Sequence, residues 1–196
     1  RLYVLTEMDK AGTVYNTPAA LELAGEVDLP MLEAAFQKLA QRHEVLRTSF
    51  HMEDGEPVQR IAGAVGTKVD TASVDNLEEE TVSGLLAEFV KPFDLGTASL
   101  MRLKLVEGPG NRSLLLFDMH HIISAGMSMT LLLAEFSALY SGRELPEQRG
   151  QYTDYSQWRR SRALRCQKAY WTAHFAGEIP ALALAALCLT TACDDD

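Results

Sequence analysis

The sequence predicts an α/β fold in which helices pack on a mixed β-sheet to form a two-layer sandwich. One observation is an apolar stripe at helical spacing, in which every third or fourth residue is apolar: Leu29, Leu32, Phe36 and Leu39. A second is the alternation of apolar and basic residues over Met101–Leu105, which indicates a half-buried strand. The third is the nearly unbroken apolar run over 113–119, typical of a central strand that is covered on both faces. Helices alternating with strands, some of them joined by hairpins, indicate a layered α/β domain.

The first half of the chain contains one predicted helix between short strands. An Ala- and Leu-rich strand is expected over 19–24. The helix begins at the N-cap Asp28, carries Pro30 in its first turn and ends near Arg42. Strands over 45–52 and 57–61 are separated by Glu-Asp-Gly, which favours a turn.

The second half alternates strands with three further predicted helices. A helix over 76–90 begins with acidic residues, which the helix dipole favours, and is stopped by Pro92. The two strands noted above are joined by the turn sequence Gly-Pro-Gly-Asn. Helices are then expected over 127–140 and 152–175, and the second of these carries a basic face.

Composition and charge exclude several classes of function. The chain has 196 residues, 18 Lys and Arg against 27 Asp and Glu, and a formal net charge of −9. Without a cationic block, neither nucleic acid nor a membrane surface is an expected partner. The longest apolar stretch, 179–193, is interrupted and too short to span a bilayer, and no targeting segment follows Arg1. Three cysteines without a CxxC pair predict reduced thiols in a cytoplasmic protein.

Two adjacent histidines, His120 and His121, mark the candidate site. They follow the buried strand directly and precede a helix, and imidazole titrates near neutral pH, so acid–base chemistry is plausible there. A simpler interpretation is that one histidine is a hydrogen-bonded core residue and the other lies on the surface. Neighbouring residues of an extended chain point in opposite directions, and no third ligand lies nearby, so no metal site is expected.

Four short motifs follow one another along the chain, at residues 42–50, 91–95, 120–126 and 152–158. Together they resemble the motifs of nonribosomal peptide synthetase condensation domains. Residues 120–126 read His-His-Ile-Ile-Ser-Ala-Gly and resemble the family's HHxxxDG signature, with Ala125 in place of the aspartate. Residues 42–50 (RHEVLRTSF) are similar to RHExLRTxF, residues 91–95 (KPFDL) to the PFDL segment, and residues 152–158 (YTDYSQW) to YxDYxxW. The resemblance covers about residues 1–180.

This resemblance implies one lobe of a chloramphenicol-acetyltransferase-like fold, in which two such lobes form a V around a substrate tunnel. It implies that His121 is the catalytic histidine, acting as general base toward an acceptor amine or positioning that amine, and that His120 is structural. Gly126 would let a backbone N–H approach the thioester, and Arg47 would pair with the motif's aspartate. No cofactor would be bound directly, because the substrates arrive on phosphopantetheine arms of peptidyl or aminoacyl carrier proteins.

Ala125 cannot supply that carboxylate, so we expect a loosened histidine loop and weak or absent peptide-bond formation. Residues 1–178 are interpreted as the N-terminal lobe, with the family's first motif cut short at Arg1, and residues 179–196 as a tail unlike the family. The C-terminal lobe is then a missing partner that another chain, or self-association, would have to replace.

The sequence is compatible with two alternative functions. The first is a trimeric acyltransferase of the chloramphenicol-acetyltransferase type, which the chain length favours and which self-association would reveal. The second is a non-catalytic module that docks carrier proteins, which Ala125 favours and which binding without turnover would reveal.

Overall fold

The computed structural model describes residues 2–161 and 165–177. The chain divides into two compact units, Arg1–Tyr152 and Thr153–Asp196. The tail expected at 179–196 lies outside the described residues. All of the candidate site residues lie in the first unit.

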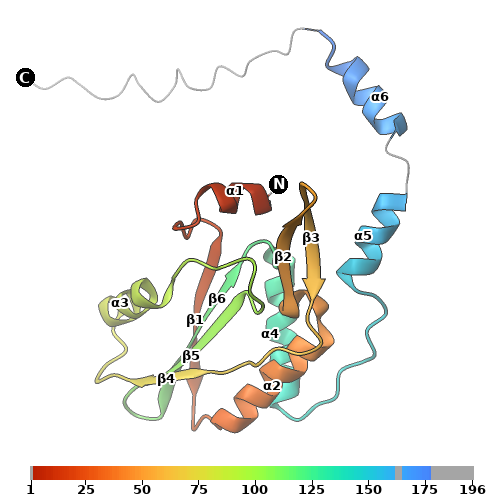
Figure 1. The fold of residues 1–196 in the computed structure, drawn as a ribbon. Coiled ribbons are helices and arrows are strands. Elements are labelled where there is room, and N and C mark those ends of the chain that lie inside the picture. Colours follow the sequence, from red (N-terminus) through yellow and green to blue (C-terminus); the bar gives the residue numbers. More distant parts are fainter. Residues whose placement is uncertain (1, 162–164, 178–196) are drawn as a thin grey trace, which may run out of the picture. The chain divides into compact units, whose positions relative to one another are not determined.

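A four-stranded mixed sheet forms the centre of the first unit (Figure 1). Its strand order is β1-β6-β5-β4, and the strands comprise Asn16–Ala24 (β1), Arg112–His120 (β6), Met101–Glu107 (β5) and Asp70–Ser73 (β4). β6 is antiparallel to both β1 and β5, whereas β4 is parallel to β5. β6 is buried along residues 113–120, which confirms the prediction of a central strand covered on both faces. β4 was not anticipated from the sequence.

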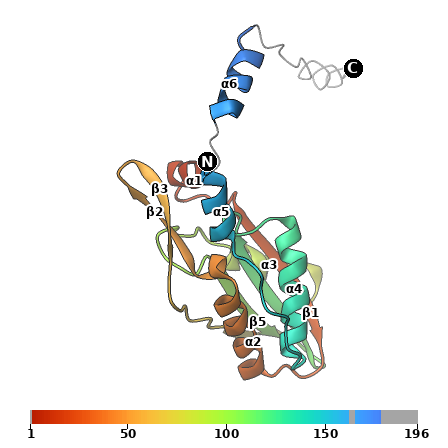
Figure 2. The ribbon, with the colours of Figure 1, turned by 90° about the vertical axis from the view of Figure 1, so that its right-hand side faces the viewer.

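Two helices, α2 (Leu29–Arg42) and α4 (Gly126–Tyr140), lie side by side on one face of the sheet (Figure 2). The predicted N-cap is confirmed, because the Asp28 carboxylate accepts a hydrogen bond from the backbone N–H of Met31 at 2.8 Å. The buried residues of both helices and the odd-numbered residues of β6 form the main core: Leu32, Phe36, Leu39, Leu132, Phe136, Leu115, Phe117 and Met119. The predicted α/β sandwich is therefore present.

In addition to these two layers, α3 (Glu79–Phe89) packs on the opposite face of the sheet (Figure 1). A smaller apolar cluster joins this helix to even-numbered residues of β6: Leu114, Leu116, Val82, Leu85, Leu86 and Phe89. The helix begins later than the predicted residue 76, because the Asn76 side chain caps the preceding turn by accepting hydrogen bonds from Glu78 N–H and the Thr81 hydroxyl.

A separate hairpin of β2 (Thr48–Glu53) and β3 (Glu56–Ile61) follows α2. The expectation that a strand begins at Val45 is wrong, since Glu44–Arg47 form a 3-10 turn, η1. The turn forms because the backbone N–H of Leu46 bonds back to the carbonyl of His43, and it re-aims the chain from the helix into the hairpin.

Three further helices complete the described chain. The short helix α1 (Leu2–Met8) was not predicted. The expected long helix over 152–175 is described as two segments, α5 (Tyr152–Ser161) and α6 (Arg165–His174), and residues 162–164 lie outside the description. In the described part of the chain, no helix combines the length and the apolar character that crossing a membrane needs.

Candidate functional site

The two histidines lie at the end of β6 and face opposite ways. His120 is only 2% exposed, whereas the side chain of His121 is exposed to solvent. This is the alternation expected of neighbouring residues on an extended chain. One histidine is thus a buried, hydrogen-bonded residue and the other is available to a ligand.

The imidazole of His120 is held at both ring nitrogens. Its Nδ1 accepts a hydrogen bond from the backbone N–H of Ile122 at 3.1 Å, and its Nε2 lies 3.3 Å from the hydroxyl of Thr6. The ring also lies beside two aromatic rings, edge-on to Phe93 and tilted to Tyr15, each with centroids 6.1 Å apart. Burial, together with the nearby His121, lowers the pKa of His120 to about 4, so this imidazole is neutral at neutral pH.

The backbone of His121 is fixed on both sides although its side chain is exposed. Its N–H donates to the carbonyl of Tyr15 at 2.7 Å, which extends the pairing between β1 and β6, and its carbonyl accepts from the N–H of Ser124 at 3.3 Å. The Ser124 hydroxyl donates to the His120 carbonyl at 3.4 Å. The main chain around His121 is therefore hydrogen-bonded without an aspartate at position 125.

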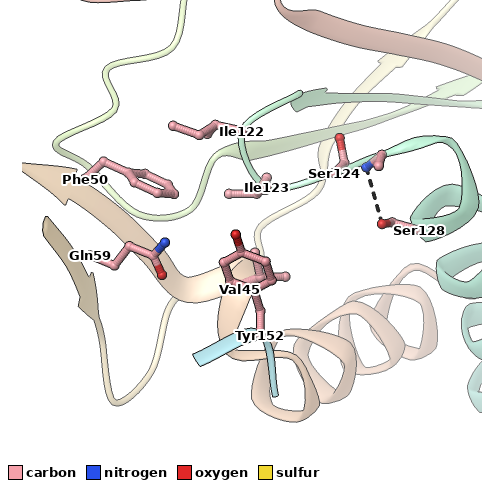
Figure 3. A pocket seen from close by; sticks show the side chains of 9 residues that line it. Val45, Phe50, Gln59, Ile122, Ile123, Ser124, Ser128 and Tyr152 are labelled. Carbon is pink, nitrogen blue, oxygen red and sulfur yellow. Dashed lines mark hydrogen bonds between the residues drawn. The ribbon is translucent and has the colours of Figure 1, made fainter. Parts of the chain in front are cut away.

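The segment that follows the histidine pair, residues 122–125, lines a cavity of about 310 Å³ (Figure 3). Phe50 and Gln59 reach it from the β2–β3 hairpin, Ile122 from the segment after β6, and Tyr152 from the start of α5. A second cavity of about 380 Å³ shares these four residues. His121, Gly126 and Arg47 are not among the residues that line either cavity. Phe50 and Tyr152 fall within the quoted motifs, but nothing in the sequence assigned them to a cavity wall.

Ala125 is the N-cap residue of α4 and carries no side-chain oxygen for the first-turn N–H groups. Instead of accepting a hydrogen bond through its side chain, Ala125 donates one: its backbone N–H bonds to the hydroxyl of Ser128 at 3.3 Å (Figure 3). Gly126 begins the helix and is exposed, and a Cβ built on it would meet no atom within 4 Å. The structure thus leaves open space around the Gly126 backbone.

Arg47, the expected partner of the missing aspartate, is mostly buried and incompletely paired. Its Nη1 donates to the Ala62 carbonyl at 2.5 Å, and its Nη2 lies 3.9 Å from Oε1 of Glu44. Its Nε is buried and has no hydrogen-bond partner among the residues that the structure describes. Glu44 and the Ala62 carbonyl offset part of the cost of burying this cation, and the unsatisfied Nε–H is the part that remains.

Restoring the carboxylate with Ala125→Asp is expected to stabilise the protein. An N-cap contributes about 1 kcal/mol, which corresponds to a rise in Tm of about 2–4 °C for a domain of this size. Ala125→Asn is the matched control, because it supplies the cap without the charge. If Arg47 pairs with residue 125, the stability advantage of Asp over Asn, measured by thermal unfolding, shrinks in an Arg47→Met background; an advantage that persists undiminished would contradict the pairing.

Behind the site, Glu135 of α4 joins the C-terminal end of α2 to the segment before α5. Its carboxylate accepts from Nε of Arg42 at 3.2 Å and from Nε2 of His43 at 2.5 Å. Gln148 lies 3.4 Å from Nδ1 of His43, and the side-chain amide of Gln151 donates to the Arg42 carbonyl at 2.8 Å. This Glu135 cluster gives the first two residues of the motif over 42–50 a structural role that sequence reasoning did not assign.

The groups around the cavity suit acid–base and hydrogen-bonding chemistry. They comprise the exposed imidazole of His121, which precedes the cavity-lining segment 122–125 in the chain, and the hydroxyl-bearing residues Ser124, Ser128 and Tyr152 of the cavity wall. Among the residues that the structure describes, no group of three His, Cys, Asp or Glu side chains could hold a metal ion.

Comparisons with known proteins place this geometry in a family. A family model for the condensation domain matches residues 1–194. One of the plipastatin synthase proteins of Bacillus subtilis (strain 168) is 46% identical over 191 residues, which cover 95% of this chain and 7% of that protein. Tyrocidine synthase 2 of Brevibacillus parabrevis is 42% identical over 186 residues, which cover 93% of this chain and 5% of that protein. The chain thus spans a small part of these relatives.

Solved structures agree on the fold. The X-domain from teicoplanin biosynthesis aligns with a TM-score of 0.75 and 27% identity, over 90% of this chain and 42% of that one. The first condensation domain of the calcium-dependent antibiotic synthetase, at 22% identity, has a TM-score of 0.69 over 92% of this chain and 48% of that one. The chain belongs to the condensation-domain family of nonribosomal peptide synthetases, and its mixed-sheet α/β fold is the fold of that family.

Proposed function

We propose that this chain is the N-terminal lobe of a condensation domain that joins a donor acyl or peptidyl thioester to an acceptor aminoacyl amine. Both substrates would be carried on phosphopantetheine arms of carrier proteins in the cytoplasm. The observation that carries the proposal is the arrangement at the end of β6, where His120 is buried and neutral while His121 is exposed and directly precedes the segment 122–125, which lines a cavity. Family membership supports the reaction type.

In this proposal His121 acts on the acceptor amine, either by accepting its proton or by holding it against the thioester carbonyl. A neutral imidazole can do both, because one ring nitrogen carries a lone pair and the other a proton. Gly126 presents its backbone N–H at the start of α4, where a helix favours developing negative charge. The remaining wall of the tunnel would come from a second lobe.

We further propose that Ala125 makes peptide-bond formation weak. The support for this is the uncapped first turn of α4 and the unsatisfied Nε–H of Arg47. The main chain at His121 keeps its hydrogen bonds to Tyr15 and Ser124, so both effects would act through the start of α4 that follows it. A displacement of about 1 Å at a reacting group can cost about a hundredfold in rate.

The same observation favours a second candidate, a module that binds carrier proteins without catalysing the reaction. The two candidates differ in turnover. Binding of a loaded carrier protein, followed by mass spectrometry of the tethered product, separates them, because only the catalytic candidate consumes the thioester.

The test of the main proposal is a chimera in which this chain is followed by the C-terminal lobe of the matching condensation domain of the plipastatin synthase protein. Dipeptide formation between two loaded carrier proteins is measured for the Ala125→Asp form. Adding His121→Ala is expected to slow the reaction by about 10²–10⁴-fold, the usual contribution of a general base. His174→Ala, which removes an imidazole from α6, serves as the matched control. Equal rates with and without His121 would contradict its proposed role.

A further inference from the structure

The tautomer of His120 follows from its contacts. A backbone N–H can only donate, so the bond from Ile122 requires an unprotonated, accepting Nδ1. The proton of the neutral ring must then lie on Nε2, which faces the hydroxyl oxygen of Thr6 at 3.3 Å. Thr6 and His120 are both buried, with 7% and 2% of their surfaces exposed, so water does not readily replace this partner.

The hydrogen bond from the Ile122 N–H to Nδ1 of His120 joins the two residues that flank His121 in the chain. The acceptor belongs to the residue before His121 and the donor to the residue after it. The backbone on both sides of His121 is therefore tied to a ring whose own orientation depends on its other nitrogen. If the proton moved to Nδ1, this nitrogen and the Ile122 N–H would both be donors and the bond would be lost.

Thr6 comes from α1, 114 residues before His120 in the sequence. Thr6 lies just after the residues at the start of the chain that resemble the end of the family's first motif, and its hydroxyl brings α1 to the end of β6. Among the residues that the structure describes, the Thr6 hydroxyl is the hydrogen-bond partner of Nε2 of His120. The His120 ring also lies beside the aromatic rings of Phe93 and Tyr15, each with a centroid 6.1 Å from its own.

We propose that Thr6 is a positioning residue. Its hydroxyl accepts the Nε2 proton of His120, which holds the ring where Nδ1 meets the Ile122 N–H and so orders the main chain that presents His121. The inference rests on the proposed function only in giving His121 a substrate to meet. The contacts themselves predict the tautomer and the order of the Ile122 backbone whether or not the chain catalyses a reaction.

The experiment compares Thr6→Val, which has the same shape but no hydroxyl, with Thr6→Ser, which keeps the hydroxyl. The histidine ring nitrogens are read by ¹⁵N NMR of the whole chain, and hydrogen exchange is measured at the Ile122 amide. In the native protein and in Thr6→Ser we expect the proton of His120 on Nε2. In Thr6→Val the buried Nε2–H has no acceptor, so we expect the ring to leave this orientation part of the time. The result is a mixture of tautomers and exchange of the Ile122 amide about tenfold faster, the equivalent of roughly 1.4 kcal/mol, near the contribution of one hydrogen bond.

Three results would overturn the proposal: a proton on Nδ1 in the native protein, a Thr6→Val spectrum like the native one with unchanged exchange, or loss of the tautomer in Thr6→Ser. The first needs no variant, so the proposal remains open to test if Thr6→Val does not fold. A shifted tautomer in Thr6→Val together with a chimera that does not need His121 would support the Thr6 contact and contradict the proposed function.

Discussion

Replacing Glu135 with alanine is expected to lower the free energy of unfolding by about 3 kcal/mol. The change leaves the side chains of Arg42 and His43 buried without the carboxylate that accepts their hydrogen bonds. The side chains of Arg42 and His43 that bond to Glu135 are only 19% and 14% exposed, and Glu135 itself is 11% exposed. This expected loss of stability is at the lower end of the range for buried ion pairs because Arg42 keeps some access to water. Urea unfolding at pH 7 measures it.

The matched control is Glu88→Ala, which removes an exposed glutamate from helix α3 and should change stability by less than about 0.5 kcal/mol. Arg42→Met added to Glu135→Ala should cost little more, since the arginine has then already lost its partner. Additive losses in this double-mutant cycle, or a small effect of Glu135→Ala alone, would contradict the interpretation of the cluster.

Acidification from pH 6.5 to pH 4 should remove about 3 kcal/mol of stability through His120 alone. Burial lowers the pKa of His120 from 6.5 to about 4 in the folded protein. As the pH falls, the unfolded chain therefore binds a proton before the folded protein does, which favours unfolding. The contribution of His120 is fully present above pH 6.5 and is lost as the pH falls toward 4, at 1.36 kcal/mol per pKa unit.

His120→Asn isolates this effect, because asparagine can offer an oxygen near the position of Nδ1 and does not titrate. The measurement is the free energy of unfolding in urea at pH 7 and pH 4 for both proteins. The native protein should lose about 3 kcal/mol more than the variant over this range. Asp118 contributes with the opposite sign, because burial raises its pKa above 3.8, but it is present in both proteins and cancels in the difference. Parallel pH profiles would show that His120 is not held neutral by the fold.

The sequence predicts those parts of the fold in which local periodicity and burial agree. The stripe along α2 and its Asp28 cap, the alternation in β5 and the apolar run of β6 each reflect one element and the surface that it covers. β4 has no such signal, since it is a short, mostly exposed strand whose pairing with β5 depends on the tertiary fold. The sequence predicted a strand where the turn η1 lies, because the β-branched and apolar residues at 45–52 are compatible with either a strand or a 3-10 turn.

For the site, the opposite orientation of the two histidine side chains could be predicted, but the contacts that fix them could not. Alternation along a strand is a local property and predicts that the two histidines face opposite ways, while the family resemblance implied that His120 is the structural one; the structure buries His120. The contacts of Thr6 with His120 and of Glu135 with His43 join residues 114 and 92 positions apart, and no spacing rule connects them. The positions of Ala125, Gly126 and Arg47 are described, whereas their roles in the reaction stay predictions.

The pairing of β1 with β6 has a consequence for how the protein is made. It joins Asn16 to His120 and Ala24 to Arg112, so β1 leaves the ribosome roughly a hundred residues before the strand that completes it. At bacterial and eukaryotic synthesis rates this interval lasts about 5–20 s. Throughout it β1 lacks its partner, and pairing between such distant segments is intrinsically slow. The histidine pair therefore takes its place only after β6 has followed β1 out of the ribosome, which makes the site form later than the first strand of its own sheet.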